Sequence, residues 1–548
     1  MNERIQRLRQ AFTASERQVD TERAVIVTRV YQQNEGKPQI IKRALAFDAI
    51  LSEMTIEIRD DELIVGNHAQ HRRGVPLFPE YAVDWILKDM DTFPTRIGDQ
   101  FRITEEQTRV LREILPYWEG RCLRDKVMGA IPSFLKEMLD DGVIRNENFT
   151  MSGPGHMVPR YPELINQGLD SVIRTCKEKI VSLDPADLEY GEKYNFYQAG
   201  IIVCDALIKY ANRFAEEACR QAREEADPKR QEELLRIASN CRRVPADAAR
   251  DLWEALQFVY FVQLGIQIEA NGLAIALGCP DQYLFPFYSK DLAAGHLTRD
   301  GAKELIECFY LKLNEIDKIY SNDATRYLQG PGHGQTITLG GVTRDGCDAV
   351  NELSYLMLEA DRDIGLVQPD IAVKIARVTP NSFVREACKN SRAGLTKPKF
   401  FNDEVVIQSV MNIGIPLEDA RDWGALGCSE PVVNGKTNSW GNSGHLNLAK
   451  CLELALHDGK CMITGKQLGP NTGDASKFTC FDQVLRAFKA QVQYFVKHIA
   501  LFDNILDRLH AENAPLAFYS VALADCIDKG AHANKGGARY NTTSPLGI

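Results

Sequence analysis

The chain has 548 residues, of which 44% are hydrophobic and 26% are charged, the ordinary composition of a globular protein with a large core. Its formal net charge of −10 argues against a nucleic-acid binder and against an anionic membrane surface as partner, because both attract basic proteins. No run of about twenty apolar residues and no signal-peptide pattern occurs, so the sequence predicts a cytoplasmic protein with no membrane partner.

Residues 1–260 are predicted to be mainly helical. Residues 104–117 open with a capping-box type of start, and residues 195–226 form a long amphipathic pattern. The helical spacing continues through 230–243 and 247–268. The stretch Asp-Leu-Trp-Glu-Ala-Leu-Gln-Phe-Val-Tyr-Phe within the last of these is nearly apolar on all sides, so we expect it inside the protein.

Short apolar runs alternate with helical stretches after residue 270. Strands are predicted at 272–278, 336–341, 369–376 and 405–411. Strands separated by helices favour an α/β arrangement for this half of the chain.

The 14 cysteines contain no Cys-x-x-Cys pair, which excludes zinc-ribbon and thioredoxin motifs. Most of them should be buried thiols that behave as small apolar side chains. His68 and His71 are three residues apart but lack a set of partner ligands, so we expect no metal site.

The most informative segment is Gly-Cys-Ser-Glu-Pro at 427–431. The glycine permits a tight turn, and the proline cannot continue a helix. Cys428 and Glu430 are two residues apart, which places a sulfur and a base on the same side of an extended segment or loop tip. A buried filler is the ordinary role of a lone cysteine, and nucleophilic catalysis would also need a histidine, which the sequence does not place beside Cys428.

This string and Gly-Lys-Thr-Asn-Ser-Trp-Gly just after it resemble the cysteine loop of glycyl-radical enzymes, the pyruvate formate-lyase-like family. The string is close to the Gly-Cys-x-Glu-Pro form of the dehydratase and lyase branch, which includes glycerol, propanediol and hydroxyproline dehydratases, choline lyase and isethionate lyase. Further stretches agree in order, at 43–69, 78–81, 155–169, 266–288, 338–341, 401–406 and 536–541. The resemblance implies an α/β barrel of two antiparallel half-sheets surrounded by helices, with the barrel part in 261–548.

The resemblance also implies a mechanism. A glycyl radical takes a hydrogen atom from the thiol of Cys428, and the thiyl takes one from a substrate carbon. Glu430 acts as the general base toward the hydroxyl on that carbon, and a neighbouring group leaves by C–O, C–N or C–S cleavage. Ser429 stands where pyruvate formate-lyases carry a second cysteine, so formate C-acetyltransferase activity is the less favoured alternative.

Four further residues are candidates for substrate binding by resemblance: His156, Asn271, Ser429 and Asn442. A core or capping histidine is the other interpretation of His156. Diol dehydratases show Asn-Gly-His-Ser where this chain has Asn-Gly-Leu-Ala at 271–274, and they show Asp in place of Asn442. Both changes remove polar groups, which puts a glycerol or propanediol substrate in doubt.

Four other charged residues have weaker interpretations. Asp281 and Asp403 are expected to hold loops near the barrel mouth. Lys374 or Arg160 could pair with an anionic group of the substrate, although a surface charge is the default for either.

The Arg-Val-x-Gly-Tyr radical motif of the family does not occur within 1–548. The resemblance therefore predicts an incomplete pyruvate formate-lyase-type domain that lacks the glycine-radical domain and is inactive alone. A fragment, one half of a split enzyme whose C-terminal half is supplied in trans, and a non-catalytic partner subunit stay open as explanations. No bound cofactor is expected. A radical-SAM activating enzyme would install the radical, and the remaining partners would be a small-molecule substrate and, left open, a second copy in a homodimer.

Overall fold

The computed structural model describes residues 1–145, 148–326 and 333–547. Its helices are α1 (Glu3–Ala14), α2 (Glu22–Gln33), α3 (Gln39–Glu53), α4 (Asp84–Asp89), α5 (Glu105–Ile114), α6 (Leu123–Ala130), α7 (Ser133–Asp140), α8 (Asn148–Met151), α9 (Tyr161–Gln167), α10 (Leu169–Val181), α11 (Tyr190–Glu224), α12 (Pro228–Arg243), α13 (Leu252–Glu269), α14 (Pro280–Tyr283), α15 (Phe285–Ala293), α16 (Arg299–Asn314), α17 (Glu352–Ile364), α18 (Asn381–Arg392), α19 (Asp403–Asn412), α20 (Leu417–Arg421), α21 (Leu448–Leu456), α22 (Phe481–Asn513), α23 (Ala517–Val521) and α24 (Cys526–Lys529). Its strands are β1 (Gln18–Asp20), β2 (Gly74–Pro76), β3 (Ile144–Arg145), β4 (Thr336–Gly340), β5 (Asp370–Ile375), β6 (Lys399–Asn402), β7 (Trp423–Leu426), β8 (Glu430–Val433), β9 (Thr437–Leu446) and β10 (Tyr540–Gly547).

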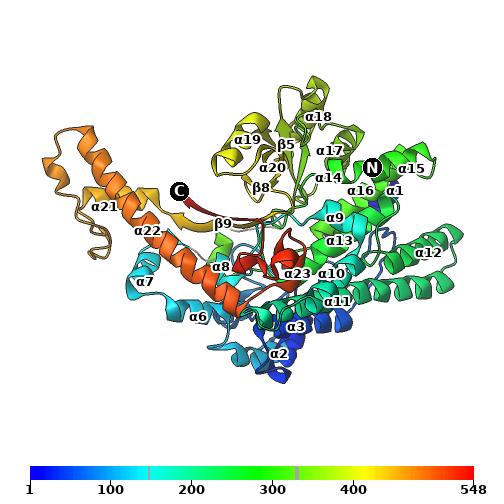
Figure 1. The fold of residues 1–548 in the computed structure, drawn as a ribbon, viewed down its shortest axis with the longest axis horizontal. Coiled ribbons are helices and arrows are strands. Elements are labelled where there is room, and N and C mark those ends of the chain that lie inside the picture. The colour runs from blue at the N-terminus through cyan, green and yellow to red at the C-terminus, as the bar shows by residue number, and fades with distance from the viewer. Residues whose placement is uncertain (146–147, 327–332, 548) are drawn as a thin grey trace.

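Three parts can be followed in Figure 1. A helical body is built by α2, α3 and α10 to α13. An α/β lobe lies above it and contains β4 to β8 with α17 to α20. An arm made by α21 and α22 projects to the left, and the long strand β9 runs between the arm and the rest of the molecule.

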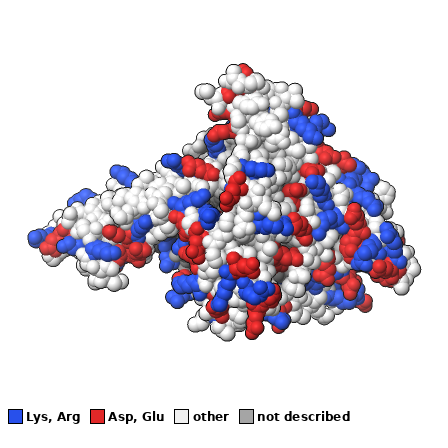
Figure 2. Space-filling model, turned by 90° about the horizontal axis from the view of Figure 1, so that it is seen from below, with Lys and Arg blue, Asp and Glu red and all other residues white. Residues whose placement is uncertain are grey.

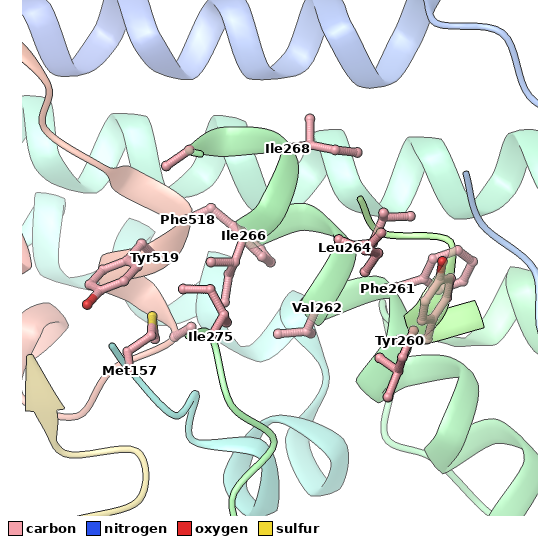
Figure 3. Packing of buried hydrophobic residues seen from close by; sticks show 14 of the residues in the cluster. Met157, Tyr260, Phe261, Val262, Leu264, Ile266, Ile268, Ile275, Phe518 and Tyr519 are labelled. Atoms are coloured by element: carbon pink, nitrogen blue, oxygen red, sulfur yellow. The ribbon is translucent and has the colours of Figure 1, made fainter. Parts of the chain in front are cut away.

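Helix α13 forms the centre of the helical body. Every residue of α13 except Trp253 is buried, which confirms the expectation from its apolar sequence. Gly265 lets the ring of Phe518 on α23 come close, because a Cβ at Gly265 would lie 2.9 Å from Phe518 Cε1. Figure 3 shows this packing, in which residues of α13 meet Phe518 and Ile275. Phe518 also stacks on Phe47 of α3, so three helices distant in sequence share one core.

The other predicted helices are present. Helix α5 begins at the N-cap Thr104, whose side chain accepts from Gln107 N while the Gln107 side chain accepts from Thr104 N, a complete capping box. The long pattern at 195–226 forms α11, and the pattern at 230–243 forms α12.

The lobe contains a parallel sheet in the order β4-β5-β6, with Thr336 opposite Asp370 and Ala372 opposite Lys399. Strands β7 and β8 form an antiparallel hairpin, and β10, β9 and β3 form a third sheet. The strands predicted at 336–341 and 369–376 are therefore confirmed.

Two predicted strands are wrong. Residues 405–411 lie in helix α19, because the side chain of Asn402 caps the helix by accepting from Val405 N and thereby outweighs the β-branched run. Residues 272–278 form only isolated bridges, and the left-handed φ of +58° at Ala274 interrupts an extended strand there.

Among the helices that the structure describes, none is both long and apolar enough to cross a membrane. On the face seen in Figure 2, lysine and arginine are interspersed with aspartate and glutamate over the helical body.

Candidate active site

The Gly-Cys-Ser segment forms the turn of the β7–β8 hairpin. Leu426 pairs with Glu430, which leaves residues 427–429 as a three-residue connection. Gly427 has a φ of +44°, which a glycine adopts without steric cost. Cys428 and Ser429 at the tip are exposed, so the sulfur is open to a small molecule instead of filling a core.

The base of the hairpin is held by buried polar side chains. Lys374 Nζ on β5 donates to the carbonyl of Trp423 at 2.8 Å. Asp403 Oδ1 accepts from Trp423 Nε1 at 2.6 Å, and Thr338 Oγ1 on β4 accepts from Ala425 N at 2.9 Å. The structural role expected for Asp403 is confirmed. Lys374 is neither a surface charge nor a substrate ligand here, because its side chain is buried and its ammonium donates to a main-chain carbonyl of the hairpin.

Arg160 and Asp281 also hold the main chain. Arg160 donates through its guanidinium to the carbonyl of Val521 at 2.9 and 3.1 Å, so its positive charge serves the fold and does not face a substrate. Asp281 Oδ2 accepts from Gly340 N at the end of β4 at 2.9 Å and from the Ser354 hydroxyl of α17 at 2.6 Å, so its role is structural, although the groups that it joins belong to a strand and a helix and not to loops.

The tip of the hairpin carries a charged environment around the thiol. Lys399, the first residue of β6, donates to the carbonyl of Gly427 at 2.9 Å and forms an ion pair with Asp370. Partial burial, with the charges of Glu430 and Asp370, raises the pKa of the Cys428 thiol above its ordinary value, and Lys399 opposes this only in part. The sulfur therefore keeps its proton near neutral pH, which suits a hydrogen-atom donor and disfavours a thiolate nucleophile.

The carboxylate of Glu430 folds back over the turn. Its Oε2 accepts from Ser429 N at 2.9 Å. A Cβ placed on Gly427 would lie 3.1 Å from Glu430 Oε2 and 3.5 Å from His156 Nε2, so the carboxylate and the imidazole share the space above that glycine. Burial lowers the pKa of His156, although the Glu430 charge opposes the shift. The arrangement places a neutral thiol, a carboxylate and an imidazole within one small volume.

Three segments from distant parts of the chain converge on the hairpin. His156 N donates to the carbonyl of Leu273 at 2.8 Å, and Ala274 N donates to the carbonyl of His333 at 2.9 Å. A Cβ on Gly334 would lie 3.1 Å from Ala274 Cβ and 3.1 Å from the Cα of the hairpin glycine. These contacts bring loops that are distant in sequence, from 93 positions for Gly334 to 271 for His156, against the turn that carries the sulfur.

Two side-chain-bearing residues of the site adopt left-handed backbone, as do Asp61, Asp458 and Asp525 elsewhere in the described chain. His156 and Ala274 have φ values of +54° and +58°, which side-chain-bearing residues rarely adopt, and Gly334 and Gly427 are left-handed as well. Each non-glycine residue in such a conformation costs on the order of 1–3 kcal/mol, and strain of this kind gathers at functional sites. The strain is thus an indication of function that is independent of residue chemistry.

The remaining candidates occupy different positions. Asn271 Oδ1 accepts from Lys318 Nζ at 3.2 Å, just before the segment that touches the hairpin. Ser429 is exposed at the tip. Asn442 belongs to β9, but its side chain lies outside the described residues. His68 is buried, and the described residues contain no group of three or more ligands that could hold a metal ion.

Sequence reasoning did not identify Lys399, Gly334 or Lys318 as neighbours of the site. Each lies far along the chain from its partner, with a sequence separation of 28 for Lys399 and Gly427 and of 47 for Lys318 and Asn271. A lysine at the start of a strand or after a helix carries no local signal of such a contact.

Comparisons with known proteins show the family to which the chain belongs. The pyruvate formate lyase-like family model matches residues 1–548, and the chain belongs to this family. A (2S)-3-sulfopropanediol dehydratase from Klebsiella oxytoca is 34% identical over 548 residues, which cover 99% of this chain and 66% of the relative.

Two solved structures are similar over the whole chain. The glycerol-bound B12-independent glycerol dehydratase from Clostridium butyricum matches with a TM-score of 0.97 and 37% identity, and 69% of its chain is covered. A glycyl radical enzyme from Archaeoglobus fulgidus matches with a TM-score of 0.96 and 32% identity, and 70% of its chain is covered. The predicted fold class is thereby confirmed, and the chain spans about two thirds of the length of the curated relatives it matches.

Proposed function

We propose that this chain carries the hydrogen-transferring cysteine and the general base of a glycyl-radical dehydratase or lyase that acts on a small hydroxylated molecule. One observation carries the proposal: the protonated thiol of Cys428 stands exposed at a hairpin tip, and the carboxylate of Glu430 folds over the same turn. The names of the matched dehydratases support the reaction class.

A glycyl radical supplies one-electron chemistry by removing the hydrogen atom of a thiol. Cys428 holds the hydrogen that is given up, takes one from the substrate carbon that bears the hydroxyl, and later returns it to the neighbouring carbon. Glu430 accepts the hydroxyl proton, for which it must lie within hydrogen-bond reach. That proton can leave with the departing group, so that elimination of water from a diol yields a carbonyl compound with atoms and charges balanced.

His156 holds the substrate in this scheme. Burial lowers the pKa of its imidazole, and a neutral imidazole carries one donor and one acceptor nitrogen, which suits contact with a hydroxyl or a leaving group. Ser429 provides a hydroxyl at the place where acetyl transfer would need a second thiol, and formate C-acetyltransferase activity is therefore not favoured.

The radical would reside on a glycine outside residues 1–548 and be installed by a radical-SAM activating enzyme. A polypeptide that carries this glycine would complete the pyruvate formate-lyase-type domain, either in the same chain or in trans. The helical part at 1–260 would then support the barrel part at 261–548, which holds the cysteine loop.

The experiment combines the chain with an activating enzyme and a polypeptide that carries the radical glycine. Product formation is measured over a substrate panel of 3-sulfopropanediol, isethionate, trans-4-hydroxy-L-proline, glycerol and propane-1,2-diol. We expect turnover of at least one substrate, and a loss of about 10²-fold or more in Glu430→Gln, because a positioned general base typically contributes that factor.

Cys388→Ser is the matched control, since Cys388 is also exposed but lies on α18 away from the hairpin. It should leave turnover unchanged. A glycyl radical signal without consumption of any substrate, or full activity in Glu430→Gln, would contradict the proposal and favour a non-catalytic subunit.

A further inference from the structure

A buried lysine lies behind the segment that faces the hairpin. Lys318 follows α16 in irregular backbone, and only 2% of its surface is exposed. Its Nζ donates to Asn271 Oδ1 at 3.2 Å. Asn271 is itself half-buried and opens the 271–274 segment that reaches the hairpin turn.

The neighbouring carboxylate, Asp317, is committed to other partners. Arg17 approaches its two oxygens at 2.7 and 3.0 Å, and His333 Nε2 lies 3.1 Å from Oδ1. The backbone N–H of Lys318 also donates to Oδ1 at 2.8 Å. Within the described ranges no carboxylate oxygen lies within 4.0 Å of Lys318 Nζ, so its ammonium is without an ion-pair partner.

An ammonium in this position is electrostatically incomplete. A buried charge normally has a counter-charge and a full set of hydrogen bonds, because water no longer compensates it. Burial, together with the charge of Arg23, lowers the pKa of Lys318 to about 7, and Asp317 only partly opposes this. One amide oxygen satisfies one of the three ammonium protons, which leaves donors for an incoming acceptor.

The position of Asn271 connects this lysine to the hairpin. Ala274, three residues further on, is in contact range of Gly427 through its Cβ, which lies 3.4 Å from a Cβ built on that glycine. Three residues span at most about 11 Å, so the Cα of Asn271 lies within about 11 Å of the Cα of Ala274, the residue that contacts the turn. Between them, Leu273 and Ala274 present apolar side chains that cannot hydrogen-bond a second substrate hydroxyl.

We propose that Lys318 and Asn271 form a subsite for the anionic group, a carboxylate or a sulfonate, of a small hydroxylated acid whose reacting carbon lies at Cys428. The assignment rests on the proposed function for the location of the reacting carbon. An anion there supplies the missing counter-charge of Lys318, and the amide N–H of Asn271 adds a second donor. Neutral diols provide no such compensation and are disfavoured as substrates.

Calorimetric titration of Cys428→Ser tests the subsite without any radical chemistry. The probes are glycolate for a carboxylate, isethionate for a sulfonate and ethylene glycol as the neutral analogue, with inorganic sulfate to measure binding of an ion alone. At pH 6, where Lys318 is charged, we expect glycolate or isethionate to bind more tightly than ethylene glycol and sulfate. In Lys318→Met that preference should fall about tenfold to a hundredfold, the value of a buried charge-assisted hydrogen bond.

Lys318→Arg keeps the charge and should retain most of the preference. Lys209→Met removes an exposed lysine of α11 and should leave the preference for the acids over ethylene glycol unchanged. Asn271→Ala should weaken acid binding less than Lys318→Met. Equal binding of acid and diol, no binding of either acid, or an unchanged preference in Lys318→Met would overturn the subsite. Because no turnover is measured, these results stand apart from the activity test of the proposed function.

Discussion

Helix α13 buries every residue except Trp253, whereas the hairpin tip at 427–429 exposes both Cys428 and Ser429. The causes of the raised pKa of the cysteine thiols also differ between the two regions. Burial alone raises the pKa of Cys241 in the helical body, whereas the charges of Glu430, Lys399 and Asp370 act beside burial on the pKa of Cys428.

The two regions differ in how closely they follow the rules of stable packing. The helical body maximises apolar contact in ordinary backbone conformations, and its cysteines are fillers. The hairpin region instead combines an exposed sulfur with left-handed backbone at His156 and Ala274 and with the buried ammonium of Lys318, and the last two features cost stability. Such costs persist where they serve a function, so the difference between the regions identifies the site without reference to any relative.

The largest stability effect is expected in the helical body. Phe518→Ala removes a fully buried ring that packs on Gly265 and Phe47, and should lower the free energy of unfolding by about 3–5 kcal/mol. Denaturant titration measures the loss. Ser429→Ala at the exposed tip should change stability by less than about 0.5 kcal/mol. Similar losses in the two variants would show that the hairpin tip contributes to stability as much as the helical core does.

The second effect concerns the pH dependence of stability through Lys318. Its folded pKa of about 7 lies below the ordinary value of 10.5, so between these pH values the unfolded chain binds more protons and stability rises with pH. Lys318→Met should be more stable than the parent at pH 7. The difference in the free energy of unfolding between Lys318→Met and the parent should shrink by about 2–3 kcal/mol from pH 7 to pH 9, since each pKa unit is worth about 1.4 kcal/mol.

The difference between Lys318→Met and the parent at each pH reports the titration of Lys318 alone. Arg23 and Asp317 are present in both, and burial holds the pKa values of His68, at about 3, and His333 below the tested window. If the difference in the free energy of unfolding between the two proteins stays constant from pH 7 to pH 9, the ammonium of Lys318 must be hydrated or paired with a counter-charge.

The third effect tests the strain at the site. Ala274→Gly should cost no stability, because glycine adopts a φ of +58° freely and offsets the lost methyl contact. Ala276→Gly is the matched control two residues away, where the alanine is equally buried without positive φ, and should destabilise by about 1 kcal/mol. Equal losses in both variants would argue against strain at Ala274.

The smallest effect concerns the thiol itself. In a chain whose other exposed cysteines are serine, the pH profile of Cys428 alkylation by iodoacetamide reports its pKa. Glu430→Gln should lower that pKa, because the carboxylate disfavours the thiolate, and Lys399→Met should raise it. Lys399→Arg should leave it close to the parent. Shifts of the same sign in the first two variants would contradict the charge environment described here.

Local patterns in the sequence predicted much of the fold. The capping box at Thr104, the apolar helix α13 and the strands at 336–341 and 369–376 are each determined by neighbours along the chain. Helix α19 was missed because the cap at Asn402 outweighs the β propensity of the residues after it.

Part of the site was also accessible from sequence. The Cys-x-Glu spacing placed the sulfur and the carboxylate on one turn, and the family resemblance singled out His156. The strain at Ala274, the anchor Lys399 and the buried Lys318 arise only when distant segments meet, so no local pattern contains them.

The central claim is that the sulfur at position 428 transfers the hydrogen atom. Its most direct test is Cys428→Ser in the complex with the activating enzyme and the polypeptide that carries the radical glycine, where electron paramagnetic resonance follows the radical and chromatography follows the product. The structure predicts a glycyl radical signal as strong as that of the parent, with product formation reduced to background. Product formed at the parent rate by Cys428→Ser would contradict the claim.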